Sequence, residues 1–379
     1  MKIYKDSFLA ILPLIFIISA SFLGTSAVDA DHLVAKSYNL PFLVSQTSIV
    51  LYYILMGFFL LTGFIFFLKN IKINYSFFYL ICAYLILFFW SIVDANDQIR
   101  YFLIMMSVIF CPMSLYYFFN KINFSLFSKY LILFSFFIII ISTIFSYLNY
   151  GNNPRISGIH NNPNLMGMWL VSLLTIILYF QEYIKKYIIL IIITCTSILV
   201  LLTGSRLAFC VLLLILIPFF VKNKIVTFIF FIVSLIYFLF GGDFINFRSV
   251  EVGSAVSDSG RIDIWEKAFI CIQNEPFVGN GMLGAQNCVH SGNVHNSYLR
   301  VLVMLGIPLT LLFFIMYFYF IFKAAISSAN IYIKFYLIGL PILFFAEDYI
   351  VGFASPFFPF FIFIISLYLY DLKKSINSI

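Results

Sequence analysis

Long runs of apolar residues, separated by short polar breaks, make up most of this chain. An α-helix needs about 20 apolar residues to cross roughly 30 Å of hydrocarbon, and most of the runs are close to that length. They lack the alternation of apolar and polar residues that marks barrel strands. The pattern predicts membrane-spanning helices at twelve places: 8–23, 47–68, 77–93, 101–119, 130–149, 165–181, 188–203, 207–221, 225–241, 296–322, 335–352 and 356–370.

One long stretch, from Gly241 to Pro308, departs from this pattern and holds the densest set of glycines together with two of the four histidines. We expect an all-α polytopic membrane protein of about twelve transmembrane helices, with one large outer loop that contains an interfacial helix. Residues 1–241 would carry helices one to nine, residues 242–295 the large loop, and residues 296–379 helices ten to twelve and a cytoplasmic tail.

The composition agrees with this class of protein. The chain has 379 residues, of which 63% are hydrophobic and only 10% are charged. Soluble domains contain about 25% charged residues, and they cannot bury so much apolar surface. A soluble enzyme is therefore excluded, and no nucleic-acid partner is expected.

Lysines and arginines are divided between the two sides of the predicted membrane segments. The lysine-bearing breaks alternate along the chain, which by the positive-inside bias makes their side, and both termini, cytoplasmic. The other side has Lys36 and Lys267 and every arginine: Arg100, Arg155, Arg206, Arg248, Arg261 and Arg300. Lysine codons in an AT-rich gene are one explanation. The other is an anionic ligand on the outer side, because the planar guanidinium pairs with two phosphate oxygens at once.

The first apolar run has two interpretations. Lys2 and Lys5 precede it and SFLGTSAVDA follows it, which is also the pattern of a cleaved signal peptide. Retention of the run gives twelve helices with both ends cytoplasmic, and we adopt that interpretation.

Residues 151–164 form a polar outer loop that is rich in asparagine and proline, which predicts turns. Asn164, which follows Pro163, is the expected N-cap of the sixth helix. Arg155 and His160 are candidates for contact with a sugar or a phosphate, and a solvated loop is the alternative for each.

The hairpin between Lys186 and Lys222 leaves each of its two helices about 17 residues, the lower limit for a membrane crossing. Its turn, Thr203 to Arg206, is therefore expected at the edge of the apolar layer. A guanidinium at that depth is costly unless it faces a partner or a cavity. Arg206 is then either an ordinary snorkelling arginine or a ligand for a lipid-linked phosphate.

Within the large loop, residues 261–273 have apolar side chains at helical spacing: Ile262, Trp265, Phe269 and Ile272. We expect an amphipathic helix on the membrane surface, with Trp265 as an interfacial anchor, ended by Pro276. Cys271 and Cys288 share the outer side, where an oxidising compartment allows a disulfide. No metal-ligand spacing occurs in the chain, so no metal or other cofactor is expected.

These features together resemble the bacterial O-antigen ligase and polymerase superfamily, best between about residues 155 and 310. The matching stretches are His160 to Asn164, Thr203-Gly204-Ser205-Arg206-Leu207-Ala208, Gly260-Arg261 with Trp265, Pro276 with Gly279 and Gly281, and His295-Asn296-Ser297-Tyr298-Leu299 followed by Gly306-Ile307-Pro308.

The resemblance implies a metal-independent membrane glycosyltransferase in the bacterial inner membrane, with a periplasmic active site and loop 242–295 in the periplasm. The donor would be an undecaprenyl diphosphate-linked glycan and the acceptor lipid A-core or another lipid-linked glycan, with membrane lipids around them. Arg206 and Arg261 would bind the diphosphate and His295 would act as general base. The further substrate-binding candidates are Arg155, His160, Asn164, Arg300 and Asp348.

Ligase and polymerase differ only in the acceptor. His295-Asn296 followed by Gly306 fits the ligase pattern, but Leu309 stands where that pattern has a small or polar residue, so the polymerase remains an alternative. A transporter of lipid-linked oligosaccharide is the alternative outside this class. Transporters bind at the bilayer midplane, often between repeats, and the sequence has no clear repeat.

Overall fold

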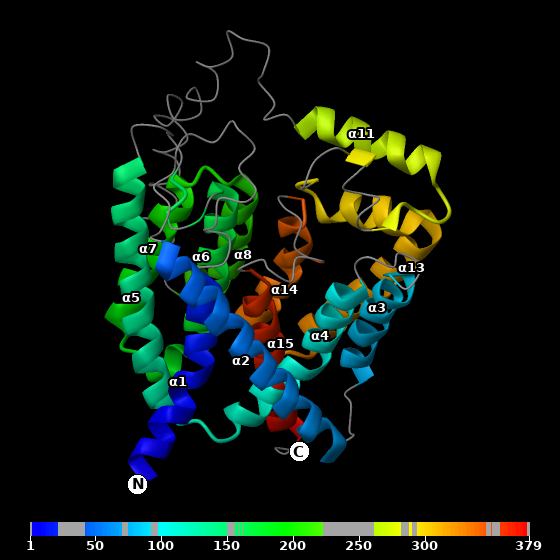
Figure 1. The fold of residues 1–379 in the computed structure, drawn as a ribbon. Helices are drawn as coiled ribbons and strands as arrows, with labels where there is room; N and C mark the ends of the chain where they lie inside the picture. Colours follow the sequence, from blue (N-terminus) through cyan, green and yellow to red (C-terminus); the bar gives the residue numbers. More distant parts are fainter. Residues whose placement is uncertain are drawn as a thin grey trace.

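The computed structural model describes residues 2–21, 42–69, 75–91, 98–149, 156–158, 160, 162–222, 261–281, 288–289, 294–345, 350 and 357–376. Every regular element in these ranges is helical (Figure 1). The helices are α1 (Lys2–Ser21), α2 (Phe42–Lys69), α3 (Tyr75–Ser91), α4 (Gln98–Phe119), α5 (Phe124–Asn149), α6 (Pro163–Tyr179), the short 3-10 helix η2 (Gln181–Tyr183), α7 (Lys186–Leu202), α8 (Arg206–Lys222), α11 (Arg261–Asn274), α13 (Ser297–Ser327), α14 (Ile331–Leu343) and α15 (Phe357–Ile376).

A helix occupies the place of eleven of the twelve predicted spans, and the ninth span, 225–241, lies outside the described residues. Four helices contain segments long and apolar enough to cross a membrane on their own: Thr47–Lys69, Phe102–Phe119, Phe124–Ile144 and Ser297–Ser327. Six further apolar helices have 10–17 residues. The chain is thus an α-helical membrane protein, and the full count of twelve crossings remains a prediction.

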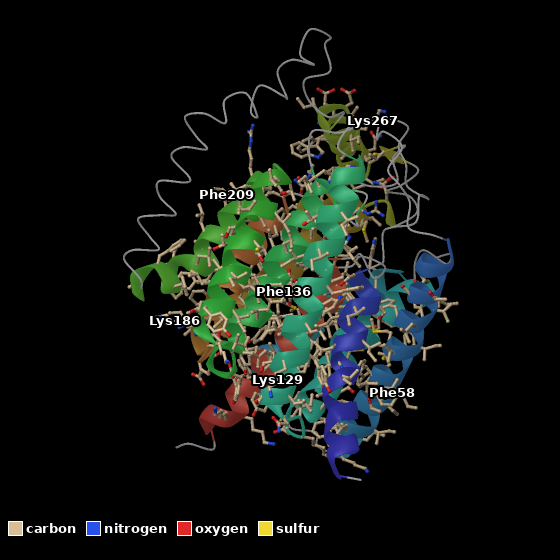
Figure 2. The ribbon with its side chains drawn as sticks, turned by 90° about the vertical axis from the view of Figure 1, so that its left-hand side faces the viewer. Phe58, Lys129, Phe136, Lys186, Phe209 and Lys267 are labelled. Carbon is tan, nitrogen blue, oxygen red and sulfur yellow. A yellow bond between two sulfur atoms is a disulfide. The ribbon has the colours of Figure 1, made fainter. Side chains whose placement is uncertain are left out.

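The two chain ends lie at the same end of the helix bundle, and α11 lies across the opposite end (Figure 1). Lys129 is near the first end, whereas Lys267 in α11 is at the other (Figure 2). The two lysines that the sequence assigns to different sides of the membrane are therefore at different ends of the bundle.

Close backbone approaches and polar pairs join the helices. A Cβ at Gly339 in α14 would be 2.7 Å from Val211 Cγ1 in α8, so only glycine allows this contact. Hydroxyl groups also connect neighbours, as in the 2.9 Å hydrogen bond between Ser172 of α6 and Tyr336 of α14. Small residues and buried hydroxyl pairs of this kind stabilise helix packing where lipid removes the hydrophobic driving force.

Two predicted spans differ in the structure. The helix predicted over 335–352 ends at Leu343, because the chain turns at Phe344 and the carbonyl oxygen of Phe344 accepts a hydrogen bond from Ser297 N at 2.9 Å. Asp348, predicted within this span, lies outside the described residues.

The helix predicted over 296–322 is broken at Gly306, where φ is 69° and ψ is 177°. Glycine adopts this left-handed conformation at little cost. Pro308, which follows, has no N–H to continue the hydrogen-bond ladder. α13 consequently has a first part before Gly306, which lies beneath α11, and a second part after it (Figure 1).

Candidate functional site

His295 lies two residues before α13, and the backbone on each side of it is hydrogen-bonded to another element. On one side, Trp265 Nε1 of α11 donates a hydrogen bond to Val294 O at 3.1 Å. On the other, Ser297 N donates to Phe344 O at the end of α14. His295 itself has a φ of 52°, which is uncommon for a residue with a side chain. The bonds to α11 and α14 hold this conformation, and strained residues held in this way cluster at functional sites.

Asn296 is the N-cap of α13. Its Oδ1 accepts hydrogen bonds from Tyr298 N at 2.9 Å and Leu299 N at 3.1 Å. The cap satisfies two of the free N–H groups of the first turn, so the helix begins at Ser297, two residues after His295. Arg300 follows within this turn and is 1% exposed.

α11 carries Arg261 as its first residue, as the sequence predicts, and ends at Asn274. Arg261 is four residues, or about 6 Å of helix rise, from Trp265. Since Trp265 bonds to the residue before His295, α11 connects the backbone positions of Arg261 and His295.

The protein leaves much of the predicted apolar stripe of α11 uncovered. Ala268, Cys271 and Ile272 are buried, whereas Ile262 is 46% exposed and Phe269 is 52% exposed. The exposed side chains are open to a membrane surface, and their contact with lipid remains a prediction. The indole N–H of Trp265, predicted as an interfacial anchor, is used within the protein.

A disulfide joins Cys271 to Cys288, with 6.1 Å between the two Cα atoms. The sequence allowed this bridge, and the structure contains it. It ties α11 to the part of the loop that leads toward His295. The remaining cysteines are free thiols: Cys82, Cys111, Cys195 and Cys210.

Arg206 is exposed and begins α8, directly after the turn that follows α7. The two helices have 17 residues each, as expected for a minimal hairpin. Gly204 has a φ of 62°, and Ser205 N donates to Thr203 Oγ1 at 3.2 Å. This glycine lets the chain reverse within three residues, so Arg206 stands at the tip of the hairpin.

Arg206 is at the same height in the bundle as the start of α13. α8 and α14 pack in opposite directions and meet where Val211 faces Gly339. Arg206 lies five residues before Val211 and Phe344 lies five residues after Gly339, so each is about 7.5 Å from that contact toward the same end. The bond from Ser297 N to Phe344 O places the start of α13 at this level too.

Asn162, not Asn164, caps α6. Its Oδ1 accepts a hydrogen bond from Asn164 N at 2.8 Å, and Pro163 occupies the first helical position. The prediction that Asn164 is the cap is wrong by two residues, because proline favours the first turn and the cap must precede it.

His160 is 2% exposed, and neither ring nitrogen has a hydrogen-bond partner. Burial lowers the pKa of His160 to about 3, so the imidazole is neutral. Its ring is 5.6 Å from that of Trp169, which donates to Ser21 of α1. Trp169 is two residues, or about 200°, around α6 from Gly167, which faces the Thr203 to Ser205 turn. The contact with Trp169 is thus on the side of α6 away from Gly167, whereas Ile156, in the same loop, donates from its N–H to Leu202 O at the end of α7 at 3.2 Å.

The other predicted site residues are placed less fully. Arg155 and Asp348 lie outside the described residues. Of the described histidine, cysteine, aspartate and glutamate side chains, no three form a group able to hold a metal ion. The backbone positions of Arg206, Arg261 and His295 are thus related through α8, α11 and α14, and their joint action in one site remains a prediction.

Sequence reasoning missed the hydrogen bonds that hold the site. Two of these bonds join segments that are far apart in the chain. Trp265 of α11 donates to Val294 O, and Trp90 Nε1 of α3 donates to Met304 O at 3.0 Å. No spacing pattern reveals such pairs. Only Asn296 had a readable signal, since an asparagine before an apolar run is a helix cap.

The sequence model of the O-antigen ligase family matches residues 188–314 of this chain. The matched stretch includes α7, α8, α11 and the first part of α13, and with them Arg206, Arg261, His295 and Arg300. It excludes the loop with His160 and Asn164.

No curated protein matches the chain. The family match nevertheless includes four of the five stretches on which the resemblance was based, and His160 to Asn164 lies outside it. Residues 188–314 are therefore similar to the O-antigen ligase family, which supports the resemblance to the O-antigen ligase and polymerase superfamily.

Proposed function

We propose that this protein is a glycosyltransferase of surface polysaccharide synthesis that takes a glycan from undecaprenyl diphosphate at the periplasmic face of the bacterial inner membrane. The observation that carries the proposal is the placement of His295, which is fixed between α11 and α14 inside the stretch that matches the O-antigen ligase family. Arg206 stands at the same level, and Arg261 begins the helix that fixes the residue before His295.

The proposed reaction moves one glycan and one proton. An acceptor hydroxyl attacks the anomeric carbon, the bond from that carbon to the diphosphate oxygen breaks, and undecaprenyl diphosphate leaves with the electron pair. His295 accepts the hydroxyl proton. The leaving diphosphate gains negative charge, which the guanidiniums of Arg206 and Arg261 stabilise through paired hydrogen bonds. Fixed cations in these positions supply the charge stabilisation without a metal.

Lipid A-core is the acceptor that we favour, which makes the protein an O-antigen ligase. The pattern of His295-Asn296 followed by Gly306 and the ligase description of the matching family support this choice. The alternative acceptor is a second carrier-linked repeat, as in an O-antigen polymerase, and the same donor site and base would serve it.

The outer position of the site is testable through the cysteines. Disulfides persist in oxidising compartments, so the Cys271–Cys288 bridge supports a periplasmic position of α11. We expect alkylation of protein denatured directly from cells to modify the four free thiols, and all six cysteines only after reduction. Six modified thiols before reduction would contradict the periplasmic assignment.

The two arginines provide the test of the transfer function. Arg206→Lys and Arg261→Lys keep the charge but remove the paired donors, so each should lower transfer about 100- to 1000-fold, as the loss of one transition-state donor does. The assay is restoration of long-chain polysaccharide in a strain that lacks its own enzyme, read as a ladder on a gel. Arg100→Lys in α4, outside the matched domain, is the control. A normal ladder from both variants, at normal protein levels, would remove the proposed role of these arginines.

A further inference from the structure

The break in α13 frees backbone groups that an unbroken helix would pair internally. Ile307 N, Val303 O and Met304 O would normally bond within the ladder, and Pro308 offers no N–H to Met304 O. In a membrane protein such groups need other partners, because the hydrocarbon offers none.

Each of the three groups has a partner outside α13. Ile307 N donates to Pro276 O at 2.7 Å, and Asn280 N donates to Val303 O at 2.8 Å. Trp90 Nε1, from the outer end of α3, donates to Met304 O at 3.0 Å. Two of the partners come from the loop after α11, and the third comes from a helix more than 200 residues away in sequence.

The loop after α11 fills the break. A Cβ at Gly279 would be 2.4 Å from Gly306 N, and a Cβ at Gly306 would be 2.7 Å from Phe277 O. Transporters use the freed groups of broken helices to bind ions or substrates. At this break, other parts of the protein form hydrogen bonds with the three freed groups. We therefore assign the break a structural role and not a role in ligand binding.

The first part of α13 connects this break to His295. Residues 297–305 form about 13 Å of helix, and Ser297 and Val303 on it are buried. A short, capped helix of this kind moves as a rigid element. A displacement at Met304 is therefore transmitted to the backbone that carries His295.

We propose that Trp90 is a positioning residue for the transfer site, acting through its hydrogen bond to Met304 O and the first part of α13. The inference rests on the proposed function of His295. Trp90 lies outside the O-antigen ligase match at 188–314, so the family comparison does not assign it. Unlike the two bonds from the loop after α11, this bond uses a side-chain donor from another helix, so a substitution can remove it without changing the loop.

The test is Trp90→Phe, which retains an aromatic ring and removes the N–H. We expect faster hydrogen exchange in peptides from residues 297–305 and a transfer rate lower by roughly 10- to 100-fold, the range that misplacement by about 1 Å produces. The affinity for the carrier-linked donor, measured on the same purified protein, should stay within about twofold. Unaltered donor binding at full stoichiometry distinguishes displacement of His295 from loss of folded protein.

Ser76→Ala is the matched control. It removes another hydrogen bond of α3, the 2.7 Å bond to Tyr368 at the opposite end of the helix, and should leave both exchange at 297–305 and transfer unchanged. Trp90→Phe with unchanged exchange, or with faster exchange and normal transfer, would overturn the proposal while the arginine and histidine variants keep their effects. If the wild-type protein transfers no glycan, the proposed function is wrong. Unchanged hydrogen exchange at 297–305 in Trp90→Phe would independently reject the link from Trp90 to α13.

Discussion

His295→Ala is expected to lower transfer by about 10²- to 10⁴-fold, the range over which a positioned general base accelerates reactions. His295 follows a carbonyl held by Trp265 and precedes an amide held by Phe344, so its backbone is fixed and the substitution changes little besides the side chain. The base acts on the acceptor proton. Donor binding, which depends on the diphosphate, should therefore remain near the wild-type value.

The measurement is turnover and donor affinity on the same preparation of purified protein. His32→Ala, which changes a histidine of the first predicted outer loop, is the control and should transfer normally. A His295→Ala variant that loses donor affinity in proportion to turnover would show that His295 binds the donor, and the assignment as base would be wrong.

Gly306→Ala should remove most activity and also destabilise the protein. A side chain at φ 69° costs about 1–2 kcal/mol, and the new Cβ would be 2.7 Å from Phe277 O and 2.9 Å from Gly279 N. These are backbone atoms that cannot rotate away, so overpacking adds roughly 1–3 kcal/mol. Because the break sets the direction of the first part of α13, relief of the overlap would displace His295.

Gly57→Ala is the control for this variant, because apart from its chain neighbours and the nearby backbone of α2 no atom lies within 4 Å of the added Cβ. It should leave the melting temperature and transfer near wild type. We expect Gly306→Ala to melt lower and to transfer at least about 100-fold less per folded molecule. Equal melting temperatures and equal transfer for the two variants would mean that the break does not determine the site.

The spans were predictable because the bilayer demands long apolar segments whatever their neighbours. For the same reason, the sequence placed Arg206 at the tip of a minimal hairpin, and α7 and α8 have the expected 17 residues. The end of α14 was not predictable, since Phe344 leaves the helix to accept a bond from Ser297, a residue in another helix. Hydropathy contains no information on such a partner.

Which part of a helix surface the protein covers was harder to predict than where the helix lies in the chain. Helical spacing identified the apolar stripe of α11, but not that the protein buries Ile272 in this stripe and leaves Ile262 and Phe269 exposed. The indole of Trp265 was predicted to meet lipid, and it meets Val294 O instead. Gly306 and Pro308 were both noted in the sequence, yet the break itself depends on the loop from Pro276 to Asn280, which packs into it.

The central claim is that this chain transfers a glycan from undecaprenyl diphosphate without a metal, and purified wild-type protein tests it most directly. The protein is given a carrier-linked glycan donor, lipid A-core as acceptor and an excess of a divalent-metal chelator, and released undecaprenyl diphosphate is counted against glycan transferred. We expect one carrier released per glycan, at a rate that the chelator does not change. No release with lipid A-core, and none with a second carrier-linked glycan as acceptor, would contradict the account.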